Sequence, residues 1–353
     1  MKKNKIIISI LVVVIILLLG FLGCFWFYKE NLKAVSNQQE EVIFEVKQGQ
    51  LQESVLQSLK ENNLIRNVDI AKLYIKLHGL SDIKYGIFTL DRSWGTEKIV
   101  EALNDATMAK QDEVMITFKE GMWAKDIAKE LENKLGVSQK ELLSLWNDTT
   151  YLQTLIKKYD FLTDDILQNE TKVKLEGFLF PETYVFRKDA SLKEITETFL
   201  DHFQLVYERN KADFDKNGKS IYEIITLASM VQYEASTVKD MGLVAGVFEN
   251  RLAKGMKLES SVSVCYSLYD DLTSGEDCEI QYLTESPYNT YLHEGLPIGP
   301  ILNPGEDAIK AALNPTKNDY LYFVADIYGD GSVYYAKTYD EQLKNQEKFN
   351  LNK

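Results

Sequence analysis

Glu234 is the residue whose type and position best fit acid–base chemistry. In the segment 220–236 (SIYEIITLASMVQYEAS), Ile224, Leu227 and Val231 recur at helical spacing, and Glu234 continues their apolar stripe two turns after Leu227. A carboxyl in such a setting is poorly solvated, which raises its pKa and makes it a proton donor near neutral pH. The alternative is a salt-bridged or helix-end glutamate. On position alone that alternative is the commoner case, so motifs elsewhere must decide.

No second acidic residue in this helix can form a catalytic pair with Glu234. Glu223 shares the helix face but precedes Glu234 by eleven residues, a separation of about 16 Å along a helix axis. We therefore interpret Glu223 as a surface or structural residue. The three histidines are too scattered in the sequence for a metal cluster, and no Gly-rich phosphate loop, CxxC pair or HExxH motif occurs. The sequence thus implies neither a metal nor another cofactor.

The N-terminus reads as a membrane anchor. Lys2, Lys3 and Lys5 precede an uncharged run over 6–28, which is long enough to cross a bilayer as a helix. The lysines favour a single pass with everything after Lys29 on the outer face of the cell membrane. A cleaved signal peptide and lipoprotein acylation at Cys24 are the alternatives. The apolar run is too long for a signal peptide and no small-x-small site follows it, so we expect an uncleaved anchor.

The rest of the chain is acidic, with a formal net charge of −13 over 353 residues. Polyanions would be repelled by such a surface, which argues against nucleic acid as a partner. Cys265 and Cys278 are the cysteines beyond the anchor. In an oxidising exterior they could form a disulfide or remain as two thiols, and the sequence leaves both open.

Hydrophobic periodicity predicts an α+β chain that positions Glu234 on a helix among short strands. Four parts are expected: a cytoplasmic tip and anchor (1–28), a polar linker (29–42), a compact module (43–112) and a mixed α+β catalytic domain (113–353). A charged loop is expected over 210–219, and a turn at 329–331. Strands are predicted at 43–46, 85–90, 113–118, 320–325 and 334–336, and helices over 51–62, 68–78, 96–103, 124–135, 139–146, 151–159, 220–236, 241–253 and 305–313.

Four segments together resemble the YceG-like family of endolytic murein transglycosylases. They are LEGFLFPETY (175–184), LASMVQYE (227–234), VAGVFENRLAKGMKL (244–258) and YNTYLHEGLPIGPILNPG (288–305). The resemblance continues through AIKAALNPTKNDYLYFVA (308–325) and covers nearly all of the chain beyond the anchor. Members of this family also carry a LysM-like module before the catalytic region, which matches the predicted module at 43–112.

The resemblance implies a lytic transglycosylase that cuts the MurNAc–GlcNAc β-1,4 bond within nascent peptidoglycan strands and leaves 1,6-anhydro-MurNAc ends, which would terminate strand elongation. It places the family's catalytic glutamate on Glu234. A single acid suffices for this reaction because the C6 hydroxyl of the sugar is the nucleophile, whereas ordinary glycosidases need two carboxyl groups. It also implies a partnership with cell-wall synthases.

Further residues in the matching motifs are candidates for contact with the glycan substrate. Glu176 could bind the sugar or orient a loop of the cleft, and a purely structural role is an equal alternative. Asn289 offers both donor and acceptor groups for an N-acetyl or hydroxyl contact. The expected substrate-binding residues are Glu176, Asn250, Tyr288, Asn289 and Tyr291.

The chain departs from the family pattern at several positions. The family usually has a glutamate where this chain has Gln232, which points away from the Glu234 face, so we expect this loss to be tolerated. The family pattern resembles Q-S-D-P-T-V where this chain has ESSVSV (259–264), so that an aspartate (here Ser261) and a proline are missing. Val333 and Gln342 replace two family histidines. Ser261, Val333 and Gln342 favour a second hypothesis from another class, a catalytically weakened member that acts as a glycan-binding or scaffold protein in cell-wall synthesis.

Overall fold

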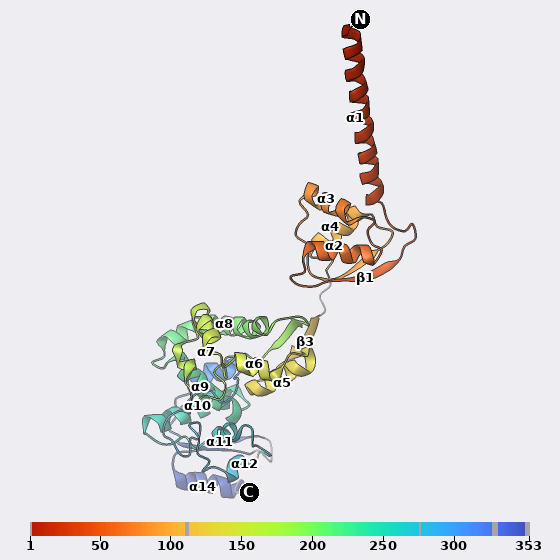
Figure 1. Ribbon diagram of the computed structural model, residues 1–353. Helices are drawn as coiled ribbons and strands as arrows, with labels where there is room; N and C mark the ends of the chain where they lie inside the picture. The colour runs from red at the N-terminus through yellow and green to blue at the C-terminus, as the bar shows by residue number, and fades with distance from the viewer. Residues whose placement is uncertain (1, 110–112, 275–276, 327–330, 350–353) are drawn as a thin grey trace. The chain divides into compact units, whose positions relative to one another are not determined.

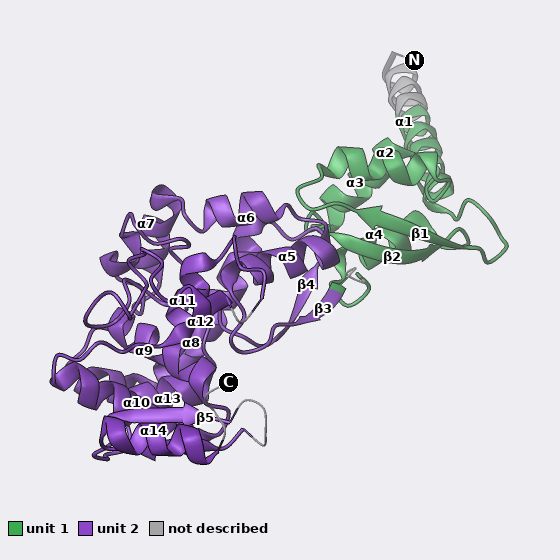
Figure 2. Ribbon diagram, turned by 90° about the horizontal axis from the view of Figure 1, so that it is seen from below, with its two compact units in different colours: residues 1–113 green, residues 114–353 purple. Residues whose placement is uncertain are grey.

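The computed structural model describes residues 2–109, 113–274, 277–326 and 331–349, with the side chains of its first helix from residue 14 onward. The chain divides into two compact units, Met1–Glu113 and Val114–Lys353 (Figure 2). Each unit has a hydrophobic core of its own. The described elements are mostly helices with three two-stranded sheets, so the predicted α+β class is confirmed (Figure 1). The predicted turn at 329–331 lies largely outside the described residues.

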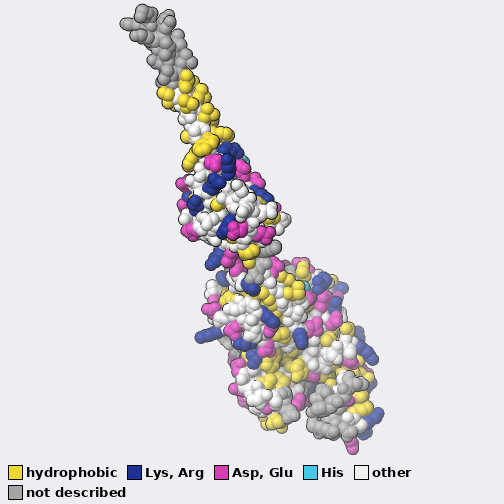
Figure 3. All heavy atoms as spheres, turned by 90° about the vertical axis from the view of Figure 1, so that its right-hand side faces the viewer, with side chains coloured by type: hydrophobic (Ala, Val, Ile, Leu, Met, Phe, Trp, Pro, Cys, Tyr) yellow, Lys and Arg dark blue, Asp and Glu magenta, His cyan; other side chains and the backbone are white. Residues whose placement is uncertain are grey.

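Helix α1 (Lys2–Leu32) contains the predicted membrane span. Its stretch Val14–Leu32 has a mean hydropathy of 1.4, and none of that stretch's most apolar window is buried inside the protein. Hydrophobic side chains gather along this part of the chain (Figure 3). Length and composition thus fit a membrane anchor. The helix ends at Leu32, later than predicted and inside the expected linker, because Leu32 is buried in the core of the first unit.

Beyond α1, the first unit combines one small antiparallel sheet with three helices. Strand β1 (Glu41–Val46) pairs with β2 (Gly86–Asp91), with Phe44 opposite Phe88 on the buried face. Phe44 and Phe88 pack in one core with residues of three helices, α2 (Gln52–Glu61), α3 (Val68–His78) and α4 (Thr96–Asn104). Helix α3 ends at Gly79, as predicted, in a left-handed conformation with φ 69° that glycine adopts without strain. The LysM-like character of this unit stays a prediction.

The second unit begins with a strand and a group of helices. Strand β3 pairs with β4, and helix α5 lies beside this pair (Figure 2). Phe178, Phe180 and Tyr184 from the LEGFLFPETY motif are buried in the core of this unit. The element bounds are β3 (Glu113–Thr117), α5 (Ala124–Leu135), α6 (Gln139–Leu145), α7 (Thr149–Lys158), the 3₁₀ turn η1 (Asp164–Leu167), β4 (Thr183–Arg187) and α8 (Leu192–Lys216).

The predicted loop at 210–219 is wrong, because α8 continues through Lys216. The Ser191 side chain and Glu194 form a capping box that starts this helix. Phe214 is buried in the core, so the charged residues around it form the solvent face of an amphipathic helix. A run of charges was therefore mistaken for a loop.

The remaining elements surround α9 (Ile221–Glu234), the helix that ends at the candidate glutamate. Ser220 and Glu223 form the capping box that starts α9, which confirms the structural interpretation of Glu223. Helices α10 and α13 pack against α9, and β5, β6 and α14 complete the C-terminal part (Figure 2). The bounds are α10 (Val238–Ala253), α11 (Ser261–Leu268), α12 (Asp277–Ile280), α13 (Glu306–Leu313), β5 (Tyr322–Ala325), β6 (Val333–Ala336) and α14 (Tyr339–Lys348).

Gly177 lies where three segments cross. Its φ of +89° is a conformation that residues with a side chain rarely adopt. A Cβ at this position would lie 2.5 Å from Cβ of Pro300 and 2.8 Å from Cγ2 of Ile225. The LEGFLFPETY motif can therefore approach α9 and the 288–305 segment this closely only with glycine here.

Gly177→Ala is expected to destabilise the protein by about 2–4 kcal/mol, because it combines backbone strain with steric overlap. Thermal unfolding of the full chain in detergent, followed by circular dichroism, measures the effect. Gly218→Ala is the matched control, since a Cβ there meets nothing within 4 Å. A melting temperature for Gly177→Ala equal to that of the control would contradict this account of the crossing.

Candidate active site

Glu234 is the last residue of α9 and is half-buried. Its Oε1 accepts a hydrogen bond of 2.6 Å from Oγ of Ser260. Burial raises the pKa of Glu234 to about 7; the Ser260 hydrogen bond opposes this shift and the charge of Glu279 adds to it. The negative end of the α9 dipole also disfavours a carboxylate at this position. Glu234 thus ends its helix, as one interpretation of the sequence has it, and burial raises the pKa of its carboxyl towards neutral pH, as the other requires.

Ser260 is fixed by a small network of buried hydroxyl groups. Its backbone N–H donates to Oγ1 of Thr290 over 3.1 Å, and Oγ of Ser263 donates to the Ser260 carbonyl over 2.7 Å. Ser263 and Thr290 are themselves hydrogen-bonded, with 2.9 Å between their oxygens. Sequence reasoning did not select Ser260, Ser263 or Thr290. The available signal was their clustering in two segments, ESSVSV, which departs from the family pattern, and the family motif YNTY.

Tyr288 and Asn289 support the loop beside Glu234 through buried side-chain hydrogen bonds. Both are buried: the Tyr288 hydroxyl accepts the N–H of Lys172, and Nδ2 of Asn289 donates to the carbonyls of Tyr282 and Thr284 over 2.9 and 2.8 Å. Asn289 has no exposed side-chain surface, so in this structure both residues support the loop. Direct sugar contact by Tyr288 or Asn289 stays a prediction.

Tyr291 is the candidate substrate-binding residue that the structure brings close to Glu234. Its side chain is half-buried, and its backbone N–H donates to Oδ1 of Asn289 over 2.9 Å. Burial raises the pKa of the Tyr291 hydroxyl, and the charges of Glu279 and Glu234 raise it further. The ring therefore lies within electrostatic reach of both carboxyl groups.

Glu176 is a buried junction between three segments. Its carboxyl accepts hydrogen bonds from the Ala124 N–H (2.9 Å), the Tyr266 hydroxyl (2.9 Å) and Nδ2 of Asn303 (2.8 Å). Burial raises the pKa of Glu176 to about 8, against the effect of these three donors. Of the two alternatives left open by the sequence, these contacts fit the structural one, and a direct sugar contact by Glu176 stays a prediction.

Asn250 supports the C-terminal segment rather than the surroundings of Glu234. Its Nδ2 donates to the carbonyls of Asn318 and Tyr320 over 3.0 and 2.9 Å. The expected substrate contact of Asn250 stays a prediction. The next residue, Arg251, is buried and forms an ion pair with Glu259 immediately before Ser260. Helix α10 is therefore linked to the site through Arg251.

The departures from the family pattern have identifiable positions. Oε1 of Gln232 accepts the Gly305 N–H over 2.8 Å, a bond that a glutamate could also accept. Ser261 is the first residue of α11. Val333 begins β6, and the buried Gln342 donates to the Phe323 carbonyl in β5 over 2.8 Å. The side chains of Gln232 and Gln342 thus form hydrogen bonds with the backbone of other segments.

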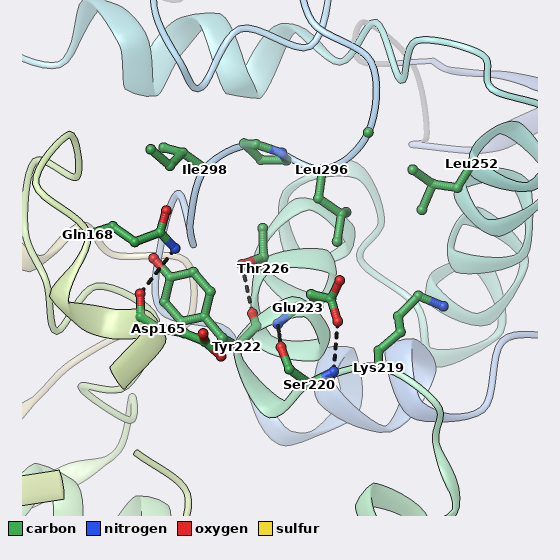
Figure 4. Close-up of a pocket in the computed structure, with 12 residues that line it drawn as sticks. Asp165, Gln168, Lys219, Ser220, Tyr222, Glu223, Thr226, Leu252, Leu296 and Ile298 are labelled. Carbon is green, nitrogen blue, oxygen red and sulfur yellow. Dashed lines mark hydrogen bonds between the residues drawn. The ribbon is translucent and has the colours of Figure 1, made fainter. Parts of the chain in front are cut away.

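A cavity of about 670 Å³ lies near the first turns of α9, at the other end of the helix from Glu234 (Figure 4). Thr226 on its wall and Glu234 are eight residues apart, about 12 Å along the helix axis. The 288–305 segment links the two places, because it carries Tyr291 and also supplies Leu296 and Ile298 to the cavity wall. The candidate carboxyl itself does not line this cavity.

Cys265 and Cys278 form a disulfide in the structure, with their Cα atoms 4.9 Å apart. It joins α11, which follows directly after Ser260, to the short helix α12. Of the two possibilities that the sequence left open, the bridge is the one found. Among the described residues no group of three or more His, Cys, Asp or Glu side chains is placed to hold a metal ion.

Fold and site together define an α+β protein with a carboxyl of raised pKa at a helix end, backed by buried hydroxyl groups. The model of the YceG-like family matches residues 44–348, and the chain belongs to this family.

Relatives and a solved structure agree with this assignment. The chain is 32% identical to the endolytic murein transglycosylase of Bacillus subtilis (strain 168), over 93% of this chain and 90% of that protein. It is 29% identical to the endolytic murein transglycosylase of Streptococcus pneumoniae serotype 2 (strain D39), of which it spans 61%. A crystal structure of a putative yceG-like protein from Listeria monocytogenes superimposes with a TM-score of 0.61 at 30% identity, covering 87% of this chain and all of the other.

The raised pKa of Glu234 predicts a pH-dependent effect of Glu234→Gln on stability. Between about pH 4.5 and 7 the native carboxyl keeps a proton that the unfolded chain releases, so rising pH destabilises the wild type through this group. The melting temperature of Glu234→Gln minus that of the wild type should therefore increase from pH 4.5 to 7 and then level off. A difference that is constant over this range would show that the carboxyl is not desolvated.

Proposed function

We propose that this chain is a membrane-anchored endolytic transglycosylase of peptidoglycan. The reaction would cleave the MurNAc–GlcNAc β-1,4 bond within nascent glycan strands, form 1,6-anhydro-MurNAc and so terminate strand elongation. Family membership over residues 44–348 and relatives bearing this name support the reaction class. The single structural observation that carries the proposal is Glu234, a half-buried carboxyl with its pKa near 7.

Glu234 can perform both proton transfers of this reaction in turn. As the neutral acid it protonates the glycosidic oxygen that leaves the muramic acid unit. The resulting carboxylate then accepts the proton of the C6 hydroxyl as that oxygen attacks C1 and closes the anhydro ring. A pKa near 7 suits both steps, because acid and base forms are both accessible at neutral pH. Ser260 would hold the carboxyl in one orientation through this cycle.

The anchor fits action close to the membrane. Helix α1 supports attachment by a single N-terminal span, and the lysines before it favour a catalytic part on the outer side. A disulfide between Cys265 and Cys278 suits an oxidising exterior. Partnership with cell-wall synthases is a further part of this proposal.

A glycan-binding or scaffold role without cleavage has less support. The departures at Gln232 and Gln342 serve backbone hydrogen bonds that do not involve the candidate carboxyl. Glu234 and its serine partner are both present and hydrogen-bonded. We therefore favour the enzyme over the binder.

Glu234→Gln should abolish the release of 1,6-anhydro ends, because the amide can neither donate the proton nor accept it. The assay is digestion of purified peptidoglycan by the full chain in detergent, with mass detection of the products. Glu223→Gln is the matched control on the same helix and should retain activity, since Glu223 acts as a helix cap. Hydrolysed reducing ends from the wild type would identify a muramidase instead, and no products at all would favour the binder.

Ser260→Ala should move the alkaline limb of the pH–rate profile to higher pH. The hydrogen bond from Ser260 lowers the pKa of Glu234, so its removal lets the carboxyl keep its proton to higher pH. Loss of one orienting hydrogen bond should also reduce kcat by about fivefold. An unchanged pH profile would mean that Glu234 is not the titrating acid.

A further inference from the structure

The segment from Asp277 to Thr284 lies beside Glu234. Asn289 donates to two carbonyls of this segment, and the next residue, Thr290, accepts the N–H of Ser260, the partner of Glu234. The charge of Glu279 also raises the pKa of Glu234. The rings of Tyr282 and Tyr291 are in contact, with centroids 5.7 Å apart. The segment is therefore part of the surroundings of the glutamate, although none of the sequence motifs includes it.

This part of the surface exposes aromatic and aliphatic groups. Tyr282 is 46% exposed and Tyr233, next to Glu234 in sequence, is 57% exposed, while Ile280 and Leu283 project from the same short segment. Exposed apolar side chains gathered at one place commonly mark a binding surface. A tyrosine provides a flat apolar face with a polar hydroxyl at its end. A sugar ring, with its C–H groups on one face and hydroxyls at its edge, is the complementary ligand.

Two anchors hold this segment in place. The disulfide from Cys278 to Cys265 ties it to α11, the helix whose first turn follows Ser260. The buried side-chain amide of Asn289 donates hydrogen bonds to two backbone carbonyls of the segment, those of Tyr282 and Thr284. The disulfide thus connects Asp277–Thr284 to the residue that directly follows ESSVSV, and the Asn289 amide connects it to YNTY. These are the two segments that position Ser260, the partner of Glu234.

We propose that Asp277–Thr284 is a wall of the glycan-binding groove, with Tyr282 as a sugar-stacking residue and the Cys265–Cys278 disulfide as the bond that positions it. This inference rests on the proposed function in one respect, the choice of a glycan strand as ligand. The contact between Tyr282 and Tyr291 makes the exposed aromatic surface continuous with the candidate active site. The ligand of this surface is therefore the glycan strand that the site is proposed to cleave. Reduction of the disulfide would loosen the wall and weaken glycan binding without touching Glu234.

Binding rather than cleavage tests the stacking residue. In the full chain carrying Glu234→Gln, the Kd for purified, uncleaved glycan strands is measured by isothermal titration calorimetry in detergent. Tyr282→Ala should raise this Kd about three- to tenfold, and Tyr282→Phe should leave it within about twofold, because stacking needs the ring and not the hydroxyl. Tyr339→Ala is the matched control, since Tyr339 is also exposed, at 60%, but lies on α14.

The same assay tests the disulfide. Dithiothreitol reduces the bridge to two thiols and is itself oxidised to its cyclic disulfide; the Kd should then rise by a factor similar to that of Tyr282→Ala. In the Tyr282→Ala protein reduction should add less than about twofold, because both changes remove the same contact. Cys265→Ala/Cys278→Ala provides a bridge-free protein that should bind weakly without reductant.

Equal Kd values for Tyr282→Ala and Tyr339→Ala would contradict the proposal that Asp277–Thr284 is a wall of the glycan-binding groove. A Kd unaffected by reduction, with Tyr282→Ala weakened, would overturn the role of the disulfide. Failure of the proposed function has a different signature: a wild type that produces no cleavage while its binding still depends on Tyr282.

Discussion

The hydrogen bond between Ser260 and Glu234 is the interaction on which the candidate site depends. It joins the C-terminal end of α9 to the turn before α11, two segments that the chain separates by 26 residues. Burial and the end of the helix disfavour the carboxylate, whereas the serine hydroxyl stabilises it. The balance of these opposing effects leaves a pKa near neutrality, which is what an acid that must later act as a base requires. Ser263 and Thr290 fix the serine, so the proton affinity of one residue is set by a buried network.

A second buried carboxyl maintains the arrangement around the first. Glu176 binds the start of α5, the Tyr266 hydroxyl of α11 and the Asn303 amide, and Asn303 in turn accepts the N–H groups of Gly177 and Leu179. An unsatisfied carboxyl in this place would cost several kcal/mol, so its three partners are effectively obligatory. The LEGFLFPETY motif thus acts as a structural junction under the site, and Gly177 lets it lie directly against α9.

The surface beside Glu234 and the cavity at the opposite end of α9 are linked by one segment, 288–305. Its first residues support Tyr291 and the disulfide-tethered segment, and its later residues line the cavity (Figure 4). An enzyme that cuts inside a strand must hold sugars on both sides of the bond. A rigid, buried backbone under an exposed aromatic surface suits that task, because binding residues are positioned best by supports that do not move.

The sequence by itself determined the α+β class, the long apolar N-terminal helix, and most helices and strands before Glu234, because periodicity is a local property of a chain. It also singled out Glu234 as the candidate acid. It failed at 210–219, where Phe214 anchors a charged helix, since burial of one aromatic residue outweighs a run of charges. Tertiary structure alone decided which motif residues are buried. Asn289 and Glu176 have the polar chemistry of ligand-binding groups, yet both are buried and used by distant backbone partners. Ser260 meets Glu234, and Tyr282 meets Tyr291, through contacts between segments far apart in the chain or in different motifs. Such contacts leave no periodic signal in the sequence.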